Sequence, residues 1–240
     1  MDKGEIWMII ALNNKSNLGK EEFLTYQEEL GNISSHSTMI LCPTLLNINL
    51  FNLNQVLLGS QNVSATKEGA YTGEVSAKHL KDSRVEYCIV GHSERREYQK
   101  EDYKTIREKV ARLLENDIIP ILCIGESKEE REMGQVETKI REELLTAISG
   151  LTEEEKNRII IAYEPIWSIG TGIIPTLEEI EDAFIYIKKI LPNNKILYGG
   201  SANEKNIDLL KQSSVIDGYL LGGLSLKPKE LQTFINKLEN

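Results

Sequence analysis

The sequence has few cysteines, few histidines and no excess of basic residues. Its three cysteines lie in separate apolar runs, and this sparse, odd number favours reduced thiols and a cytoplasmic protein over a disulfide scaffold. Acidic residues outnumber basic ones by 37 to 28, which gives a formal net charge of −9. This balance argues against a nucleic-acid partner, which requires a basic face. It also means that local groups must capture any anionic ligand, because the overall field does not attract one.

Long apolar runs are also absent. No segment approaches the ~20 apolar residues of a membrane span. The apolar run Ile6–Leu12 is short, ends in Asn13-Asn14-Lys15 and lacks a small-residue cleavage site. It therefore indicates a buried strand rather than a signal sequence, and we expect no membrane partner.

What the sequence does contain is a regular succession of apolar strand-like runs and amphipathic helical stretches. Continuous apolar runs are typical of parallel strands that are buried on both faces. Eight such runs are predicted, at Trp7–Leu12, Thr38–Cys42, Val56–Ser60, Tyr87–Val90, Ile118–Ile124, Ile159–Tyr163, Lys195–Tyr198 and Gly218–Leu221. Helices are predicted between most of them, at Lys20–Leu30, Thr105–Asn116, Val136–Ile148, Leu177–Leu191 and Lys227–Leu238.

Eight strand–helix units predict a single (β/α)8 barrel, with residues 1–240 forming one domain of a size common for this fold. An open doubly wound sheet is the alternative. It would require a glycine-rich fingerprint directly after the first strand, where this chain has Asn13-Asn14-Lys15. The sequence therefore favours the barrel.

Local signals predict how some of the helices begin and end. Gly31 is expected to stop the first helix in a left-handed conformation, and Thr176 with Glu179 forms a capping-box pattern. The Asn-rich stretch 47–55 predicts only a stub of helix.

Polar residues and glycines follow several of the predicted strands. In such a barrel, functional residues gather at the carboxyl ends of the strands. These ends carry Asn13 and Lys15, His92 with Ser93 and Glu94, Glu126, Glu164, Gly199-Gly200-Ser201, and Gly222-Gly223. Glycine pairs let backbone N–H groups approach an oxyanion, and barrels often bind phosphate after strands seven and eight. We therefore expect a phosphate site at the last two pairs.

The segment around Glu164 is the most informative in the chain. An apolar strand leads straight into this carboxylate, Pro165 then fixes the backbone, and an apolar stretch with glycines follows. A strand end holds a catalytic base rigidly, and residues 165–171 are suited to close over it as a lid. Glu126 is expected to be structural and to anchor a neighbouring loop.

His92 is the histidine that follows a strand, whereas His36 and His79 lie in polar contexts. Its place beside Ser93 and Glu94 favours a catalytic role. No second His or Cys falls at ligand spacing, so we expect no metal.

Taken in order, these segments resemble the triosephosphate isomerase family over nearly the whole chain. The resemblance is carried by Asn13-x-Lys15, Gly59-x-Gln61-Asn62-Val63, Gly69-Ala70-Tyr71-Thr72-Gly73-Glu74-Val75-Ser76, Val90-Gly91-His92-Ser93-Glu94-Arg95-Arg96, Cys123-Ile124-Gly125-Glu126, Ala162-Tyr163-Glu164-Pro165-Ile166-Trp167 through Gly172, Tyr198-Gly199-Gly200-Ser201 and Gly218-x-Leu220-Leu221-Gly222-Gly223. It implies an enzyme that interconverts dihydroxyacetone phosphate and D-glyceraldehyde 3-phosphate in glycolysis and gluconeogenesis, through an enediol(ate) and without cofactor or metal.

The resemblance also implies roles for individual residues. Glu164 would be the base, neutral His92 would polarise the carbonyl oxygen, and Lys15 would supply positive charge near the oxyanion. The substrate would also be bound by Asn13, Gly170, Ser201, Gly222 and Gly223, with Glu94 and Ser93 in support. The family further implies a homodimer in which the segment around Thr72 inserts beside the neighbouring subunit's lysine loop.

The chain departs from the family pattern at several positions, among them Leu12, where glycine is usual. Asn14 replaces the usual aromatic residue, Ser16 a larger one, and Ser168 and Leu224 the usual alanines. These changes are expected to affect how the lysine loop, the lid, the phosphate loop and the dimer are held. Two other functions stay open: another barrel enzyme acting on a sugar phosphate, such as an epimerase, and a barrel that binds phosphate without turnover.

Overall fold

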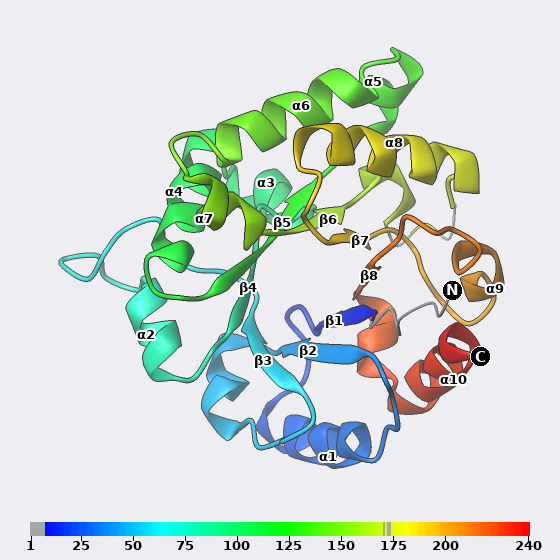
Figure 1. Cartoon of the computed structure of the whole chain (residues 1–240). Coiled ribbons are helices and arrows are strands. Elements are labelled where there is room, and N and C mark those ends of the chain that lie inside the picture. Colours follow the sequence, from blue (N-terminus) through cyan, green and yellow to red (C-terminus); the bar gives the residue numbers. More distant parts are fainter. Residues whose placement is uncertain (1–7, 170, 172–173) are drawn as a thin grey trace.

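Eight parallel strands close into a barrel, which confirms the predicted fold and excludes the open sheet (Figure 1). The computed structural model describes residues 8–169, 171 and 174–240. The strands follow one another around the barrel in chain order: β1 Ile9–Asn13, β2 Thr38–Cys42, β3 Leu57–Ser60, β4 Tyr87–Val90, β5 Ile119–Ile124, β6 Ile160–Tyr163, β7 Ile196–Tyr198 and β8 Gly218–Leu221. The ring closes where β1 pairs with β8, with Ile9 opposite Gly218 and Leu12 opposite Leu221.

All eight predicted strands are present; β2, β4 and β8 have the predicted bounds, and the other five differ by one or two residues at an end. Trp7, predicted as a strand residue, lies outside the described residues. Val56, Ile118 and Ile159 are buried although they precede the strands, so their apolar character reflects burial beneath the helices rather than strand pairing.

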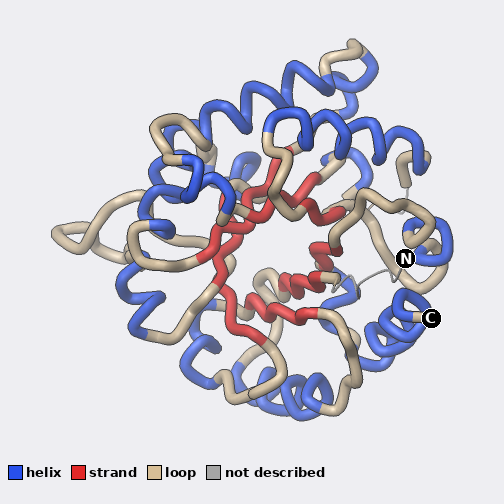
Figure 2. Tube along the Cα trace, in the orientation of Figure 1, coloured by secondary structure: helices blue, strands red, loops and turns tan. Residues whose placement is uncertain are grey.

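Helices surround the strands, as Figure 2 shows in blue around red. The longer helices are α1 Lys20–Gly31, α4 Tyr103–Leu114, α6 Val136–Ala147, α8 Leu177–Ile190 and α10 Pro228–Glu239. Shorter ones are α2 Ala77–Asp82, α3 Ser93–Gln99, α5 Lys128–Glu132, α7 Glu153–Asn157, α9 Ile207–Leu210, and the 3₁₀ turns η1 Leu45–Leu50, η2 Ile166–Ser168 and η3 Gly223–Leu226. Among the described residues, no helix is long and apolar enough to cross a membrane.

The five longer helices confirm the five helices that were predicted, and η1 is the predicted stub. The capping box of α8 is present, since the Thr176 N–H donates to Glu179 and the Glu179 N–H donates to the Thr176 hydroxyl. The predicted stop at Gly31 is wrong. Gly31 is still helical, and the cap is Asn32 in a right-handed conformation, whose N–H reaches the carbonyls of Glu29 and Leu30.

Alternate strand residues fill two separate apolar layers. On β5, Ile121 and Cys123 belong to a cluster inside the barrel, whereas Leu122 and Ile124 belong to a larger cluster between strands and helices. Burial on both faces is why these strands read as continuous apolar runs. The cysteines Cys42, Cys88 and Cys123 are buried and free.

Candidate active site

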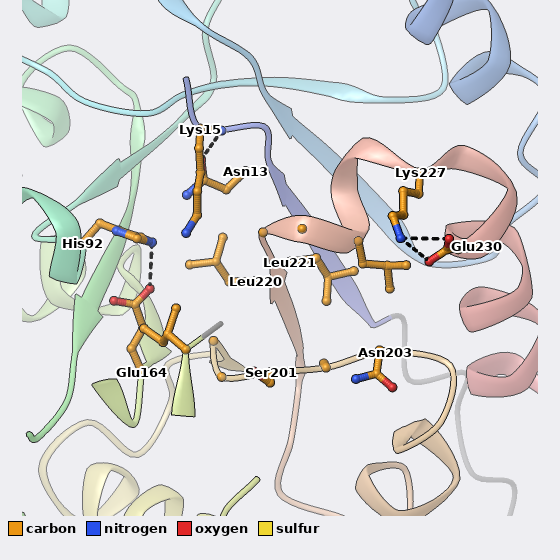
Figure 3. Close-up of a pocket in the computed structure, with 17 residues that line it drawn as sticks. Asn13, Lys15, His92, Glu164, Ser201, Asn203, Leu220, Leu221, Lys227 and Glu230 are labelled. Carbon is orange, nitrogen blue, oxygen red and sulfur yellow. Dashed lines mark hydrogen bonds and ion pairs between the residues drawn. The ribbon is translucent and has the colours of Figure 1, made fainter. Parts of the chain in front are cut away.

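A cavity of about 350 Å³ opens at the carboxyl ends of the strands (Figure 3). It is lined by side chains and glycines that follow β1, β4, β6, β7 and β8. Seven residues predicted from the sequence meet there: Asn13, Lys15, His92, Glu164, Ser201, Gly222 and Gly223. Gly170 lies outside the described residues.

Glu164 and His92 face each other across this cavity. The Glu164 side chain follows β6 and is 3% exposed, and its Oε1 lies 3.2 Å from the His92 Nε2. Its other oxygen accepts a hydrogen bond of 3.2 Å from the Ser93 N–H. A nearly dry carboxylate is thus held by the Ser93 N–H and faces a ring nitrogen of His92.

The hydrogen bonds of His92 fix which ring nitrogen carries its proton. The Glu94 N–H donates to His92 Nδ1 at 3.2 Å, so Nδ1 acts as an acceptor. The proton of the neutral ring then sits on Nε2, the atom that faces Glu164 and the cavity. His92 is therefore arranged to donate a hydrogen bond as a neutral imidazole.

Lys15 brings a cation to the same place. Its Nζ lies 2.5 Å from Glu94 Oε1, and its backbone takes the left-handed conformation with φ of 53°. The lysine loop, residues 13–17, is held by the Asn13 side chain, which accepts from the Lys15 N–H, and by Gln61, which donates to the Lys15 carbonyl. Gln61 was not predicted as a site residue, although it lies within a motif of the resemblance.

Gly222 lies close to the Lys15 side chain. A Cβ on Gly222 would lie 3.2 Å from Lys15 Cε, so the loop after β8 runs directly beside the lysine. The loop at residues 222–226, called the phosphate loop because a phosphate is predicted to bind there, begins beside the lysine side chain. Ser201 closes the opposite side, and its hydroxyl donates to the Ser168 carbonyl at 2.6 Å. The arrangement suits an anion.

Glu126 anchors the segment after Glu164, as predicted. It is fully buried, and its carboxylate accepts from Trp167 Nε1 at 3.0 Å and from Arg131 Nε at 2.9 Å. The Tyr163 hydroxyl also donates to it, at 2.9 Å. Burial and the neighbouring Glu126 charge raise the pKa of Tyr163 well above its ordinary value, so its proton stays in place.

Arg96 and Glu143 join the ends of β4 and β5 from behind the cavity. Arg96 donates to the carbonyls of Gly91 and Cys123 and to Glu143, which accepts from the Gly125 N–H. Burial raises the pKa of Glu143, and Arg96 opposes that rise. No sequence signal points to Glu143, since a carboxylate on an amphipathic helix is expected at the surface.

Comparison with known proteins gives the family. The chain matches the family model described as triosephosphate isomerase over residues 8–238. The chain belongs to the triosephosphate isomerase family. It is 39% identical over 222 residues to the triosephosphate isomerase of Dictyoglomus turgidum, covering 87% of this chain and 89% of that one. It is 43% identical over 188 residues to the triosephosphate isomerase of Alkaliphilus oremlandii, covering 75% of this chain and 76% of that one. It is 37% identical over 237 residues to the triosephosphate isomerase of Vesicomyosocius okutanii, covering 93% of this chain and 96% of that one.

Asn14, Ser168 and Leu224, which depart from the triosephosphate isomerase pattern, are buried in this structure. Asn14 is 1% exposed and hydrogen-bonds to neighbouring elements, so the lysine loop is held by polar contacts where the family has an aromatic ring. Ser168 is fully buried, and its hydroxyl lies beside that of Tyr198. Leu224 lines the cavity and is 8% exposed.

A second hollow, of about 450 Å³, lies beside the first one. Lys15, Ser16 and Glu94 line it, together with Gly73 and Glu74. Thr72 does not reach either cavity of its own chain. It is exposed on the loop between β3 and α2, which extends away from the barrel in Figure 1.

Proposed function

We propose that the protein interconverts dihydroxyacetone phosphate and D-glyceraldehyde 3-phosphate. The observation that carries this proposal is the pairing of a buried carboxylate with a neutral imidazole N–H, Glu164 Oε1 to His92 Nε2 at 3.2 Å, on one cavity. Moving a proton between adjacent carbons requires a base at the carbon and a hydrogen-bond donor at the oxygen. Triosephosphate isomerase is itself the reference case for this pair of groups.

The proposed steps conserve atoms and charge. The Glu164 carboxylate takes a proton from the C1 carbon of dihydroxyacetone phosphate, and the electron pair moves onto the C2 oxygen to give an enediolate. His92 Nε2–H donates to that oxygen and passes the proton between the two oxygens, while Lys15 and Asn13 stabilise the negative charge. The protonated Glu164 then returns its proton to C2, which yields the aldehyde without a cofactor or metal.

The phosphate would bind at the other side of the cavity. Backbone N–H groups of Gly222 and Gly223, with Ser201 and Gly170, are the proposed donors. Closure of residues 165–171 would exclude water, which strengthens the Lys15 charge and protects the intermediate. Glu94 would hold Lys15, and the Ser93 N–H would hold Glu164.

The proposed function also implies a domain organisation, a cellular location and an assembly. Residues 1–240 would form one domain, act in the cytoplasm in glycolysis and gluconeogenesis, and pair as a homodimer. The hollow beside Lys15 and the extended loop that carries Thr72 support a dimer in which each subunit's loop fills the other's hollow.

Isomerisation of glyceraldehyde 3-phosphate by the parent chain and by Glu164→Gln tests the function. We expect turnover in the parent and a loss of kcat by about 10²–10⁴ in the variant, the usual contribution of a general base. Glu155→Gln is the matched control, since Glu155 caps α7 at the opposite end of the barrel and glutamine can keep that cap. Phosphate binding without turnover in the parent would overturn the proposal and indicate a binding protein.

A further inference from the structure

Asn14 stands at the junction of three segments that are far apart in sequence. Its amide Nδ2 lies 3.3 Å from the Ser225 hydroxyl of the phosphate loop and 3.5 Å from the Tyr26 hydroxyl of α1. Asn14, Ser225 and Tyr26 are 1%, 0% and 5% exposed. Water therefore does not substitute for these contacts.

The direction of every hydrogen bond in this group is determined. The Tyr26 hydroxyl donates to the Ser225 carbonyl at 2.7 Å, and the Ser225 hydroxyl donates to the Asn13 carbonyl at 3.0 Å. Each hydroxyl has one proton, so both oxygens can only accept from Asn14. The Asn14 amide must then turn its NH₂ toward them, and its Oδ1 is buried without a hydrogen-bond partner in the described part of the chain.

The group connects the two loops that line the cavity. Ser225 binds the Asn13 carbonyl through its side chain and the Gly222 carbonyl through its N–H, at 2.9 Å. Asn14 lies between Asn13 and Lys15, and its own carbonyl accepts from Asn17 at 2.7 Å. The lysine loop and the phosphate loop are thus linked through buried hydrogen bonds rather than through apolar packing.

We propose that Asn14 is a positioning residue that, through Ser225 and Tyr26, sets the distance between the Lys15 amine and the phosphate loop. It touches no substrate. An unpartnered buried carbonyl opposes stability, so a side chain selected for stability alone would be apolar here. The proposal rests on the proposed function, because the distance matters for a substrate that carries both an oxyanion and a phosphate.

Asn14→Leu separates positioning from stability. Leucine has a similar volume and removes the unpartnered Oδ1, while both hydroxyl protons keep their acceptors. We expect the thermal midpoint to stay within ~2 °C of the parent or to rise. We expect kcat/KM to fall about tenfold, mainly through KM, because small displacements of binding groups are costly. Calorimetric titration should show weaker binding of inorganic phosphate.

Asn194→Leu is the matched control. Asn194 is equally buried and also has an unpartnered Oδ1, but it precedes β7 at the other end of the barrel and donates to the carbonyls of Lys156 and Ile159. Its loss is expected to lower the thermal midpoint and to leave KM and phosphate binding unchanged.

Ser225→Ala and the double variant test the same connection if Asn14→Leu does not fold. Because both residues act through one link, the double variant is expected to cost no more in kcat/KM than the worse single one. Unchanged KM and phosphate affinity in both single variants, or losses that simply track the unfolded fraction, would overturn the proposal. Absence of turnover in the parent would overturn the proposed function instead, and phosphate binding would still test the link.

Discussion

Gly199 lies so close to Glu164 that a Cβ on it would come within 2.8 Å of the Glu164 Cγ. The glycine after β7 therefore leaves the space in which the carboxylate sits, and it has this role in addition to any contact with phosphate.

Gly199→Ala is accordingly expected to displace the base. A carboxylate moved by a fraction of an ångström loses its alignment, so we expect kcat to fall by roughly 10–100-fold. Steady-state kinetics measures this. Gly19→Ala is the control, because a Cβ at Gly19 meets its nearest neighbour, the flexible end of Glu22, at 3.5 Å. A kcat within twofold of the parent would show that the glycine is not required by Glu164.

Trp167→Phe is expected to loosen the segment after Glu164 more than it destabilises the barrel. The variant loses the indole N–H bond to Glu126, while Arg131 and Tyr163 still bind that carboxylate. A hydrogen bond to a charged group contributes about 1.5–3 kcal/mol. We expect at least a fivefold loss of kcat/KM, measured by steady-state kinetics.

Glu126→Gln is expected to lower stability more than Trp167→Phe does. It removes the buried negative charge that accepts from Arg131, Tyr163 and Trp167 together, and is expected to destabilise the fold by about 3 kcal/mol in urea unfolding, although Arg131 keeps its ion pair with Glu179 at 2.9 Å. Equal stability losses in Trp167→Phe and Glu126→Gln would contradict the distinction between the two contacts.

The buried thiols predict a loss of stability at alkaline pH. Burial raises the pKa of Cys88 to about 12 and the pKa values of Cys42 and Cys123 well above the ordinary range. A raised pKa stabilises the fold fully below the unfolded value of ~8.5, and this contribution is lost as pH rises through the window up to the folded value. Each thiol is expected to remove about 1.4 kcal/mol per pH unit.

Urea unfolding at pH 8, 9 and 9.5 measures that slope. Cys88→Ala should reduce the part of the slope that comes from thiols by about one third, because one of three buried thiols is removed; buried tyrosines such as Tyr163 and Tyr198, whose pKa values are also raised, add to the slope toward pH 9.5. A slope that is the same in the parent and in Cys88→Ala would argue against burial of this thiol.

Thr72→Glu is expected to dissociate the proposed homodimer. The hollow that would receive the partner's loop is lined by Lys15 and Arg95 as well as by Glu74 and Glu94. Both cations are already paired, with Glu94 and Glu101, so a carboxylate at position 72 would be buried without compensation. Sedimentation should then give the 27.2 kDa protomer, whereas Thr72→Ser should behave as the parent. A parent chain that already sediments at the protomer mass would contradict the dimer.

The barrel and the residues around its main cavity could be predicted because both follow from local sequence. Strands buried on two faces read as apolar runs, and parallel closure brings all their carboxyl ends together, which is why Lys15, His92 and Glu164 meet. Short helices such as α5 and α7, of five residues each, are too short for helical periodicity to show.

Contacts between distant segments could not be predicted. Ser225 looks like an ordinary loop residue until its hydroxyl is placed against the Asn13 carbonyl, 212 positions away. Gly31 failed as a predicted helix stop because Asn32 completes the cap in a right-handed conformation. Both features depend on which residue in the folded chain supplies a hydrogen-bond partner, and a local sequence pattern does not contain that information.

The pairing of β1 with β8 has a consequence for biosynthesis. Strand β1 cannot pair with β8 until residues 218–221 have left the ribosome, because these two strands lie near opposite ends of the described chain. Asn13 and Lys15 from the first strand and Gly222 from the last share one cavity, so no nascent fragment carries a working site. Contacts of such long sequence separation form late, and until then the edges of β1 and of the growing sheet remain open to wrong partners.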